Sequence, residues 1–449
     1  MPGPTRREFL WAGGVAVLAP RIARRDPVRD LRHLVRGPVL TPHDSRGLVY
    51  DERWQRRRPR AVVQALDHAD VQAVVRWAAA HPHIPLRVRS GGHSYGGWST
   101  VSGGVVLDLR RLRGVRLRGS TAIVGAGAQL IDVYAALARH GATVPAGSCP
   151  SVAVGGHLLG GGMGLAARDR GLTADNLRAV DLVTADGRLR HVDAHSHPDL
   201  FWACRGGGGS FGVATRFELR VHPARRAAWF QCSWPAASAG EALAAWQRWA
   251  PHTDHRLTSI FTLTAGRVSA LGQFRGSARE LGALIRPLTR VAGARVSVGT
   301  AAYLDLMRRW AGCLDHSLRE CHTVPGGVLP RARFTATSAY YTHPVPAAGR
   351  RALAALVEHR GVVLLDAYGG AINRVGRHAT AFVHRDALFC AQALVYFDAA
   401  GTDAALRWLR RARHTLAAHS DGHAYQNYAD PGLRHFRRAY YGSNLARLE

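Results

Sequence analysis

The chain has 449 residues, of which 47% are hydrophobic and 20% charged, a composition that excludes a disordered or fibrous protein and suits two or three globular domains. Its 60 basic and 31 acidic residues give a net charge of +29, which would ordinarily suggest a nucleic acid or an anionic surface as partner. Every basic residue is arginine, however, and the arginines are scattered along the chain. We therefore attribute the charge to GC-rich coding and expect no nucleic-acid partner.

The N-terminus combines two arginines with a short apolar run. Arg6 and Arg7 precede apolar residues over 11–19, a run shorter than the ~20 residues needed to cross a bilayer. The pattern resembles a twin-arginine export signal, so we expect residues 1–23 to be a signal peptide. Export would place a secreted protein outside the cytoplasm, with no stable membrane anchor.

From Arg60 to Val221 the chain alternates strand-like and helix-like segments, which predicts an α/β region. Two of the expected strands flank an Asp186-Gly187 turn, which is typical of a β-hairpin. Strands are expected over 61–66, 84–89, 105–109, 122–124, 180–184, 189–192 and 213–221, and a helix over 70–81.

In residues 223–420 the helix-like segments are longer and lie between strand-like ones, which predicts a second domain of α+β type.

The six cysteines are few for an exported chain, so disulfides are not expected to hold the fold together, although Cys313 and Cys321 are candidates for a pair. No HExxH or paired CxxC motif occurs, and we expect no metal site. Helices are expected over 240–250, 278–291, 347–359 and 402–418.

Glycine is abundant, with 49 residues, and it clusters in several short loops. Such loops let backbone N–H groups approach phosphates closely, which suits a large diphosphate cofactor, although glycine-rich turns are also expected from GC-rich coding. A Rossmann dinucleotide site is excluded, because Gly125 and Gly127 follow a strand but Leu130 occupies the third glycine position of the fingerprint.

Two glycine-rich segments resemble the flavin-attachment segments of the berberine-bridge-enzyme-like oxidases, a subgroup of the vanillyl-alcohol-oxidase flavoproteins. They read RSGGHSY over 89–95 and PAGSCPSV over 145–152. The segments YQNYAD over 425–430 and YYGSNLARL over 440–448 are similar to the C-terminal signature of that family. Residues 369–373 and 380–385 match its middle region.

The resemblance implies a two-domain PCMH-type FAD-binding fold of α+β class, with an antiparallel sheet in the substrate domain. Residues 45–222 would form the FAD-binding domain, 223–420 the substrate-binding domain, and 421–449 a segment returning to the FAD-binding domain.

The same resemblance implies FAD held by two covalent bonds. The imidazole of His93 would bond the 8α-methyl carbon and the thiolate of Cys149 carbon 6 of the flavin, and both groups are suitable nucleophiles. The alternative for His93, one of 24 histidines, is an ordinary loop residue. The other residues expected to contact FAD are Arg89, Ser90, Gly91, Gly92, Ser94, Tyr95, Gly147, Val152, Gly155, Gly156, Gly160, Gly161, Gly162, Gly164, Val213, Tyr428 and Asn444.

Oxidation of an alcohol needs a group that takes the hydroxyl proton while hydride leaves the carbon. Tyr428 matches the tyrosine of the family near the reactive ring edge, with Tyr425 as second choice. A tyrosine with pKa ~10 is a weak base at neutral pH, so a neighbouring group must assist it. The alternative is that Tyr428 packs against the flavin without acting as a base.

These features predict an exported, monomeric oxidase that takes a small-molecule substrate. It would transfer hydride from a sugar hydroxyl or lactol to FAD, with O2 as final acceptor and H2O2 released. One alternative is a tailoring oxidase of secondary metabolism, for alcohol oxidation or oxidative cyclisation. Another is an inactive flavin fold that binds acidic surfaces.

Overall fold

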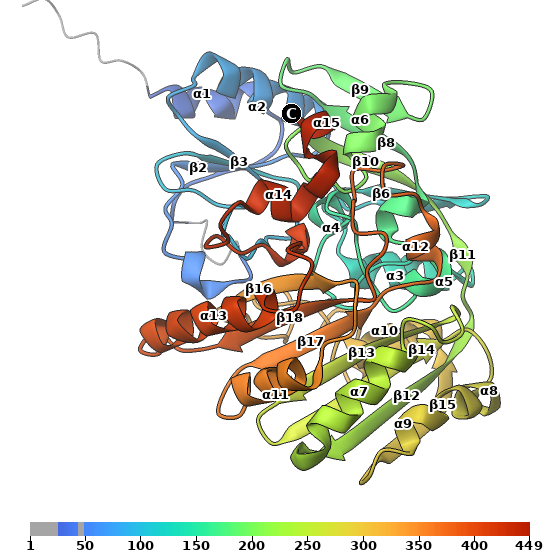
Figure 1. Ribbon diagram of the computed structural model, residues 1–449. Coiled ribbons are helices and arrows are strands. Elements are labelled where there is room, and N and C mark those ends of the chain that lie inside the picture. Colours follow the sequence, from blue (N-terminus) through green and yellow to red (C-terminus); the bar gives the residue numbers. More distant parts are fainter. Residues whose placement is uncertain (1–25, 44–48) are drawn as a thin grey trace, which may run out of the picture.

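The computed structural model describes residues 26–43 and 49–449 (Figure 1). The twin-arginine motif and the apolar run after it lie outside these residues. Within the described residues, no helix combines the length and apolar character that crossing a bilayer requires.

The first layer is a four-stranded sheet near the N-terminus, in the order β1-β2-β4-β3. β2 and β3 run parallel to β4, and every residue of β2 and β4 is buried, as expected for parallel strands covered on both faces. The helix expected over 70–81 is present, and Asp67 caps its first turn. The elements are α1 (Pro27–Leu34), β1 (Val39–Leu40), β2 (Ala61–Gln64), α2 (His68–Ala80), β3 (Leu86–Arg89) and β4 (Val105–Asp108).

The second layer is a five-stranded antiparallel sheet in the order β5-β6-β10-β8-β9. The expected hairpin around Asp186-Gly187 is confirmed, because β8 and β9 pair directly across it. Its apolar side chains join those of the first sheet and of α3 in one core. The elements are β5 (Val115–Arg118), β6 (Thr121–Gly125), α3 (Leu130–Ala138), β8 (Leu177–Val183), β9 (Leu189–Asp193) and β10 (Val213–Arg220).

The third layer is a seven-stranded antiparallel sheet in the order β15-β12-β14-β13-β17-β18-β16, which confirms the antiparallel sheet expected in the second half of the chain. The strands are β12 (Arg226–Pro235), β13 (Leu257–Thr264), β14 (Arg267–Phe274), β15 (Arg295–Ala302), β16 (Phe334–Tyr341), β17 (Val362–Ala367) and β18 (Phe389–Tyr396).

Three helices cover one face of this sheet, and Trp246 and Trp408 from two of them are fully buried against it (Figure 1). They are α7 (Ala239–Trp249), α11 (Ala347–Leu356) and α13 (Thr402–Ala417), close to the expected ranges. The prediction of a single helix over 278–291 is wrong. The chain forms α8 (Ala278–Leu284) and α9 (Arg286–Thr289), because Pro287 cannot donate the backbone hydrogen bond that a continuous helix requires.

The last residues leave the third layer and lie against the first two (Figure 1, red). Leu448 packs against Trp202 and Ala203 of α6 (Pro198–Ala203). Cys313 and Cys321, between β15 and β16, form a disulfide. The elements of the final segment are η4 (Gln426–Tyr428), α14 (Phe436–Tyr441), η5 (Gly442–Asn444) and α15 (Leu445–Leu448). The exact domain boundaries at 222 and 420 stay a prediction.

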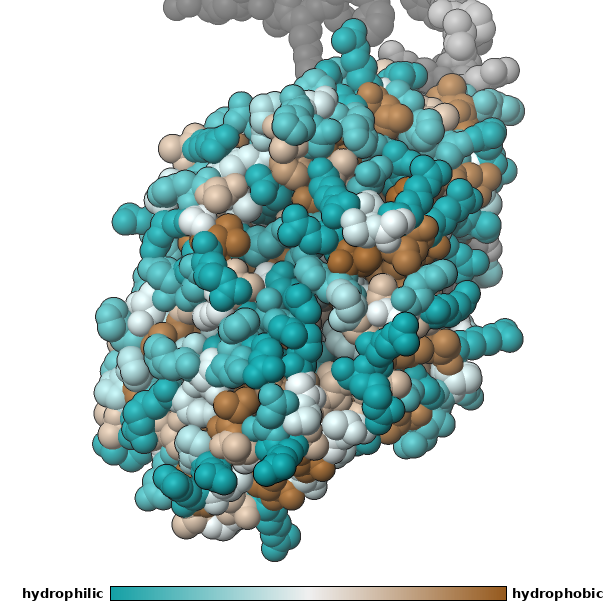
Figure 2. Space-filling model, turned by 90° about the vertical axis from the view of Figure 1, so that its right-hand side faces the viewer, coloured by the Kyte–Doolittle hydropathy of each residue, from teal (hydrophilic) through white to brown (hydrophobic). Residues whose placement is uncertain are grey.

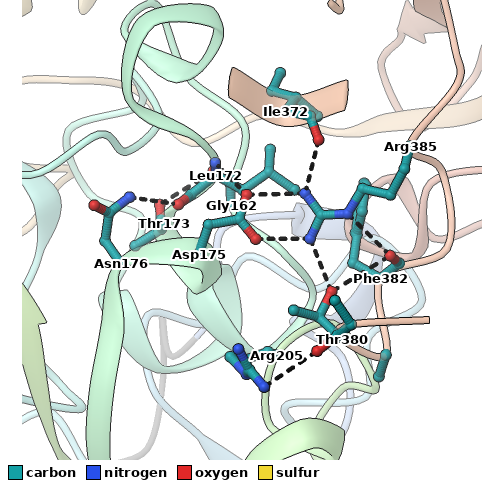
Figure 3. Close-up of polar contacts among 12 residues, drawn as sticks. Gly162, Leu172, Thr173, Asp175, Asn176, Arg205, Ile372, Thr380, Phe382 and Arg385 are labelled. Atoms are coloured by element: carbon teal, nitrogen blue, oxygen red, sulfur yellow. Dashed lines mark hydrogen bonds and ion pairs between the residues drawn. The ribbon is translucent and has the colours of Figure 1, made fainter. Parts of the chain in front are cut away.

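A buried ion pair joins the part of the chain that precedes β8 of the second sheet to the loop between β17 and β18 of the third (Figure 3). Asp175, in η2 (Thr173–Asn176), receives two hydrogen bonds from Arg385, at 2.6 and 2.9 Å. The Asp175 carboxylate also accepts the backbone N–H of Leu172 at 2.9 Å. The Arg385 guanidinium further donates to Thr380 Oγ1 and to the carbonyl of Ile372. Each charge thus has several partners, the condition under which a buried pair is tolerated.

Removing one partner should therefore be costly. Asp175→Asn is expected to destabilise the protein by about 3–5 kcal/mol, because the Arg385 charge stays buried without its counter-charge. Asp199→Asn, which removes an exposed pair with Arg447, should change stability by less than about 1 kcal/mol. Urea unfolding of both variants measures the difference. Equal, small effects would contradict the assigned role of Asp175.

Candidate active site

The face of the molecule shown in Figure 2 is mainly hydrophilic, with apolar residues gathered in several small groups. His93 lies in the loop after β3, where its ring is held from two sides. Its Nε2 atom is 2.9 Å from Ser151 Oγ, and its ring stacks on Tyr50 with centroids 4.3 Å apart. Burial lowers the pKa of His93 to about 3. The imidazole is therefore neutral at physiological pH, which leaves one ring nitrogen with a free electron pair, as a nucleophile requires.

Cys149 is the exposed member of the four free cysteines, whereas Cys204, Cys232 and Cys390 are buried. Although its side chain is accessible, the surrounding protein raises the pKa of its thiol by desolvation, and the negative charge of Asp366 raises it further. The chain therefore holds this sulfur as a thiol near neutral pH. The negative charge of Asp366 therefore disfavours the thiolate form expected for Cys149.

The two candidate nucleophiles meet around Tyr50 and Ser151. Ser151, which bonds His93, follows Cys149 by two residues. The pKa of Tyr50, which stacks on His93, is raised to about 12 by burial and then by the charges of Tyr396 and Cys149. The imidazole and the thiol thus border one region, although they belong to loops far apart in the sequence.

Glycines let these two loops pack backbone against backbone. A Cβ atom on Gly91 would lie 2.6 Å from the backbone nitrogen of Ala153, and one on Gly155 would lie 2.9 Å from Ser90 Oγ. The Ser90 hydroxyl donates to the carbonyl of Ala126 at 2.6 Å. Larger residues at either glycine would separate the His93 loop from the Cys149 loop.

The next glycine cluster follows α4 (Val154–Leu159). Gly161 and Gly162 have φ angles of 116° and 85°, values that favour glycine. The N–H groups of Gly162 and Met163 donate to the Tyr425 hydroxyl at 3.0 and 3.3 Å. Tyr425 therefore holds this loop, and its expected catalytic role stays a prediction.

Gly147 and Gly164 also sit where the backbone is crowded. The Gly147 N–H donates to His157 Nε2 at 3.1 Å, and a Cβ atom on Gly164 would lie 1.8 Å from the Ala146 carbonyl oxygen. Gly156 is different, because a Cβ atom there would meet no other part of the described chain within 4 Å. The open space beside Gly156 leaves room for a ligand at this loop.

Three of the expected FAD contacts have other partners. Arg89 forms a buried ion pair with Asp108 at 2.8 Å, and Val213 pairs with Val183 in the second sheet. The Asn444 side chain donates to the carbonyls of Arg377, Thr380 and Ala381, and its oxygen lies 2.6 Å from His378 Nδ1. Contact of Arg89, Val213 and Asn444 with the cofactor stays a prediction.

Tyr428 donates a hydrogen bond to Asp366 Oδ2 at 2.9 Å. Asp366 lies in β17 with 5% of its surface exposed, and burial raises its pKa to about 6, although the bond from Tyr428 partly opposes the shift. Burial and then the charge of Asp366 hold the pKa of Tyr428 well above its usual value. The hydrogen bond places Asp366 where it could accept a proton from Tyr428, and sequence reasoning had left the group that assists Tyr428 open.

The ring of Tyr95 lies parallel to that of Tyr428, with centroids 6.1 Å apart and 7° between the planes. Gln392 of β18 donates to the Tyr95 hydroxyl at 2.9 Å. Neither Asp366 nor Gln392 was expected at the site. A signal existed for both, because each is the lone polar residue of an apolar strand, in VVLLDA and in FCAQALVY.

The donor and acceptor pattern of the described residues fits FAD. Two buried amide oxygens, Gln129 Oε1 and Gln426 Oε1, have no hydrogen-bond partner among the described residues. Gln426 Nε2 donates to the carbonyl of Gly206 at 2.6 Å, and Gln129 bridges to Ala153 beside the Cys149 loop. A flavin and its ribityl chain carry N–H and O–H donors that such oxygens can accept.

Gly160 offers a test of how the loops position Tyr428. A Cβ atom there would lie 2.1 Å from Asn427 Oδ1. Gly160→Ala is therefore expected to displace η4, to destabilise the protein by about 1–3 kcal/mol and to lower flavin reduction by substrate. Gly282→Ala, in α8, where an added Cβ atom would meet nothing else of the described chain within 4 Å, is the matched control. Thermal unfolding and stopped-flow absorbance compare the two, and similar behaviour would contradict the assigned crowding at Gly160.

The chain is similar to known flavoproteins over most of its length. The FAD binding domain family matches residues 59–193. The uncharacterized FAD-linked oxidoreductase YgaK of Bacillus subtilis is 32% identical over 409 residues, which cover 87% of each chain. A chitooligosaccharide oxidase of Gibberella zeae is 27% identical over 423 residues, or 87% of this chain and 83% of the other. The solved structure of BBE-like 1 from Physcomitrella patens is 28% identical, with a TM-score of 0.88 over 94% of each chain.

Proposed function

Because the chain belongs to the berberine-bridge-enzyme-like FAD-linked oxidoreductases, we propose that it oxidises a hydroxyl or lactol group of a carbohydrate, with FAD bound through both His93 and Cys149. O2 would be the final acceptor, giving H2O2. The buried hydrogen bond between Tyr428 and Asp366 carries this proposal, because it provides a base beside the expected flavin.

A carbohydrate substrate is supported by one of the relatives, which is named a chitooligosaccharide oxidase. The residues around Tyr428 suit such a substrate. They combine the aromatic faces of Tyr95 and Tyr428 with the polar groups of Gln392 and Asp366, a mixture typical of small-molecule sites. The twin-arginine-like motif at Arg6 and Arg7 supports export of the enzyme.

In the proposed reaction the substrate hydroxyl approaches the Tyr428 oxygen. Bound FAD supplies the acceptor for the hydride that leaves the substrate carbon. As the carbon–oxygen double bond forms, the hydroxyl proton moves to the Tyr428 oxygen and the phenolic proton of Tyr428 moves to Asp366. Asp366 thus stores the proton, which avoids a free tyrosinate at a position where burial disfavours that charge.

The covalent bonds would be made by His93 and Cys149. Neutral His93 is prepared for nucleophilic attack by its low pKa, and Ser151 and Tyr50 fix its ring. The surroundings of Cys149 raise its thiol pKa, so the protein supplies position more than acidity at this residue. Two attachments in two loops would retain the cofactor outside the cell, where lost FAD is not replaced.

Mass spectrometry of proteolytic peptides tests the attachment. The peptides that contain His93 and Cys149 are expected together on one flavin-bearing species. Single variants His93→Ala and Cys149→Ala should each keep one covalent bond, and the double variant should lose covalent flavin. Cys204→Ala, at a buried free cysteine, should leave the attachment unchanged. Unmodified His93 and Cys149 peptides in active enzyme would refute the proposal.

The roles of Tyr428 and Asp366 are tested by the rate of flavin reduction. Tyr428→Phe is expected to lower this rate by about 100-fold or more while flavin content is kept, since general bases contribute about 10²–10⁴-fold. With a pKa of about 6, Asp366 is ionised above that pH, so kcat/KM should rise with pH through about 6. Asp366→Asn should remove that rise.

Tyr441→Phe serves as a control, because it removes the hydroxyl of a half-buried tyrosine in α14, outside the pair. Its reduction rate and pH profile should match those of the unaltered enzyme. An unchanged reduction rate in Tyr428→Phe, or a pH profile that keeps its acid limb in Asp366→Asn, would exclude the proposed proton transfer.

A further inference from the structure

The segment that carries Cys149 is attached to the helix α3 on the N-terminal side of the sulfur. The Tyr134 hydroxyl of α3 donates to the Gly147 carbonyl at 2.8 Å. This carbonyl belongs to the peptide unit that joins Gly147 to Ser148, directly before Cys149. Because glycine allows the widest range of backbone angles, the plane of that unit needs an external contact to be fixed. The Tyr134 hydroxyl provides one.

The same helix also binds the segment on the C-terminal side of Cys149. The first residue of α3 has no side-chain cap before it, and its free N–H groups find backbone acceptors instead. The N–H of Leu130 donates to the Val152 carbonyl at 2.8 Å, and that of Ile131 donates to the Pro150 carbonyl at 3.2 Å. Hydrogen bonds from one helix therefore lie on both sides of the candidate nucleophile.

α3 is a firm support for this segment, since other elements hold it on two sides. Its inner residues lie in the core shared by the first two sheets. On the outside, Ile131 packs against the disulfide between Cys313 and Cys321. Nε2 of His322 lies 3.1 Å from a carboxylate oxygen of Asp132, and this bond raises the pKa of His322. The first turn of α3 is thus fixed where it meets the Cys149 segment.

The state and direction of the Tyr134 side chain suit it to hold a carbonyl. Burial, followed by the charges of Tyr303 and Cys149, holds the pKa of Tyr134 well above its usual value. The hydroxyl therefore stays protonated and donates. The ring of Tyr303, the first residue of α10 (Tyr303–Trp310), meets that of Tyr134 edge to face with centroids 6.3 Å apart. The contact limits the directions in which the hydroxyl can point.

We propose that Tyr134 is a positioning residue for flavin attachment, which acts through the Gly147 carbonyl to hold the Cys149 sulfur where it can reach carbon 6 of the flavin. The S–H bond of Cys149 and the C–H bond at carbon 6 are replaced by a C–S bond. The two hydrogens, with their electrons, go to O2 and leave as H2O2. This inference rests on the proposed function and adds the means by which a thiol that its surroundings keep protonated is made to react.

The test measures the two flavin bonds separately in Tyr134→Phe, which keeps the ring and removes only the hydroxyl. The protein is kept with excess FAD in air after production, and peptides are analysed by mass spectrometry at intervals. Among molecules with flavin on His93, the fraction that also carries the Cys149 bond should rise about tenfold more slowly than in the unaltered enzyme. One lost hydrogen bond contributes about that much. Attachment to His93 should be unchanged.

Tyr341→Phe is the matched control. Tyr134 and Tyr341 have 3% and 1% of their surfaces exposed, and each hydroxyl donates to a backbone carbonyl at 2.8 Å. Tyr341 lies in β16 and bonds the Leu416 carbonyl of α13, so it shares the lost bond but not the contact with the Cys149 segment. Its variant should form the Cys149 bond at the normal rate.

A second background separates positioning from a general effect on folding. In Cys149→Ala, adding Tyr134→Phe should leave the content of His93-linked flavin unchanged, because Tyr134 acts through Cys149. A loss of that flavin would show a merely structural role and overturn the inference.

A normal rate of Cys149 attachment in Tyr134→Phe, or an equal delay in Tyr341→Phe, would also overturn the inference, and both outcomes leave the proposed function intact. Absence of the Cys149 bond from the unaltered enzyme would instead refute the proposed attachment at Cys149 and this inference with it.

Discussion

The hydrogen bond between Tyr428 and Asp366 is the interaction on which the site depends. A carboxyl group with 5% exposure is expensive to bury as an ion, and burial raises its pKa to about 6. The partner that offsets this cost is the Tyr428 hydroxyl, which comes from a segment 62 residues away. The same burial raises the pKa of Asp366 toward neutral pH, so one physical cause underlies both the contact and the proposed proton transfer.

The hydrogen bond between Tyr428 and Asp366 can form because hydrogen bonds to neighbouring elements fix the segment that carries Tyr428. Each of the four residues 425–428 bonds a different part of the molecule. The Tyr425 N–H donates to Ser338 Oγ in β16, Gln426 to the Gly206 carbonyl, Asn427 to the His157 carbonyl and Tyr428 to Asp366 in β17. The segment thus ties the seven-stranded sheet to α4 and to the loop that contains Gly206.

Sequence reasoning could single out short segments of the candidate site. The loops around His93 and Cys149 were predicted because their glycine-rich segments resemble the flavin-attachment segments of the family, whereas the residue types alone left His93 open to an ordinary loop role. Asp366 and Gln392 could not be placed, since their position depends on which strands pair. The register that sets Asp366 opposite Cys390 joins β17 to β18 and is a property of the whole sheet. Similarly, periodicity alone extended a helix across Pro287, where backbone chemistry ends it.

The protein environment favours the reactive neutral form of His93 but disfavours the reactive thiolate form of Cys149. Burial makes His93 a neutral nucleophile, but desolvation and the charge of Asp366 both act against the thiolate of Cys149. In the proposed reaction Asp366 also accepts the Tyr428 proton, so a change that favoured the thiolate by removing this carboxylate would remove that acceptor. Position must then compensate for the unfavourable pKa, and a thiol held beside its target reacts as if at a very high concentration. The crowding around Gly91 and Gly155, which fixes the two loops against each other, is the structural means of holding it there.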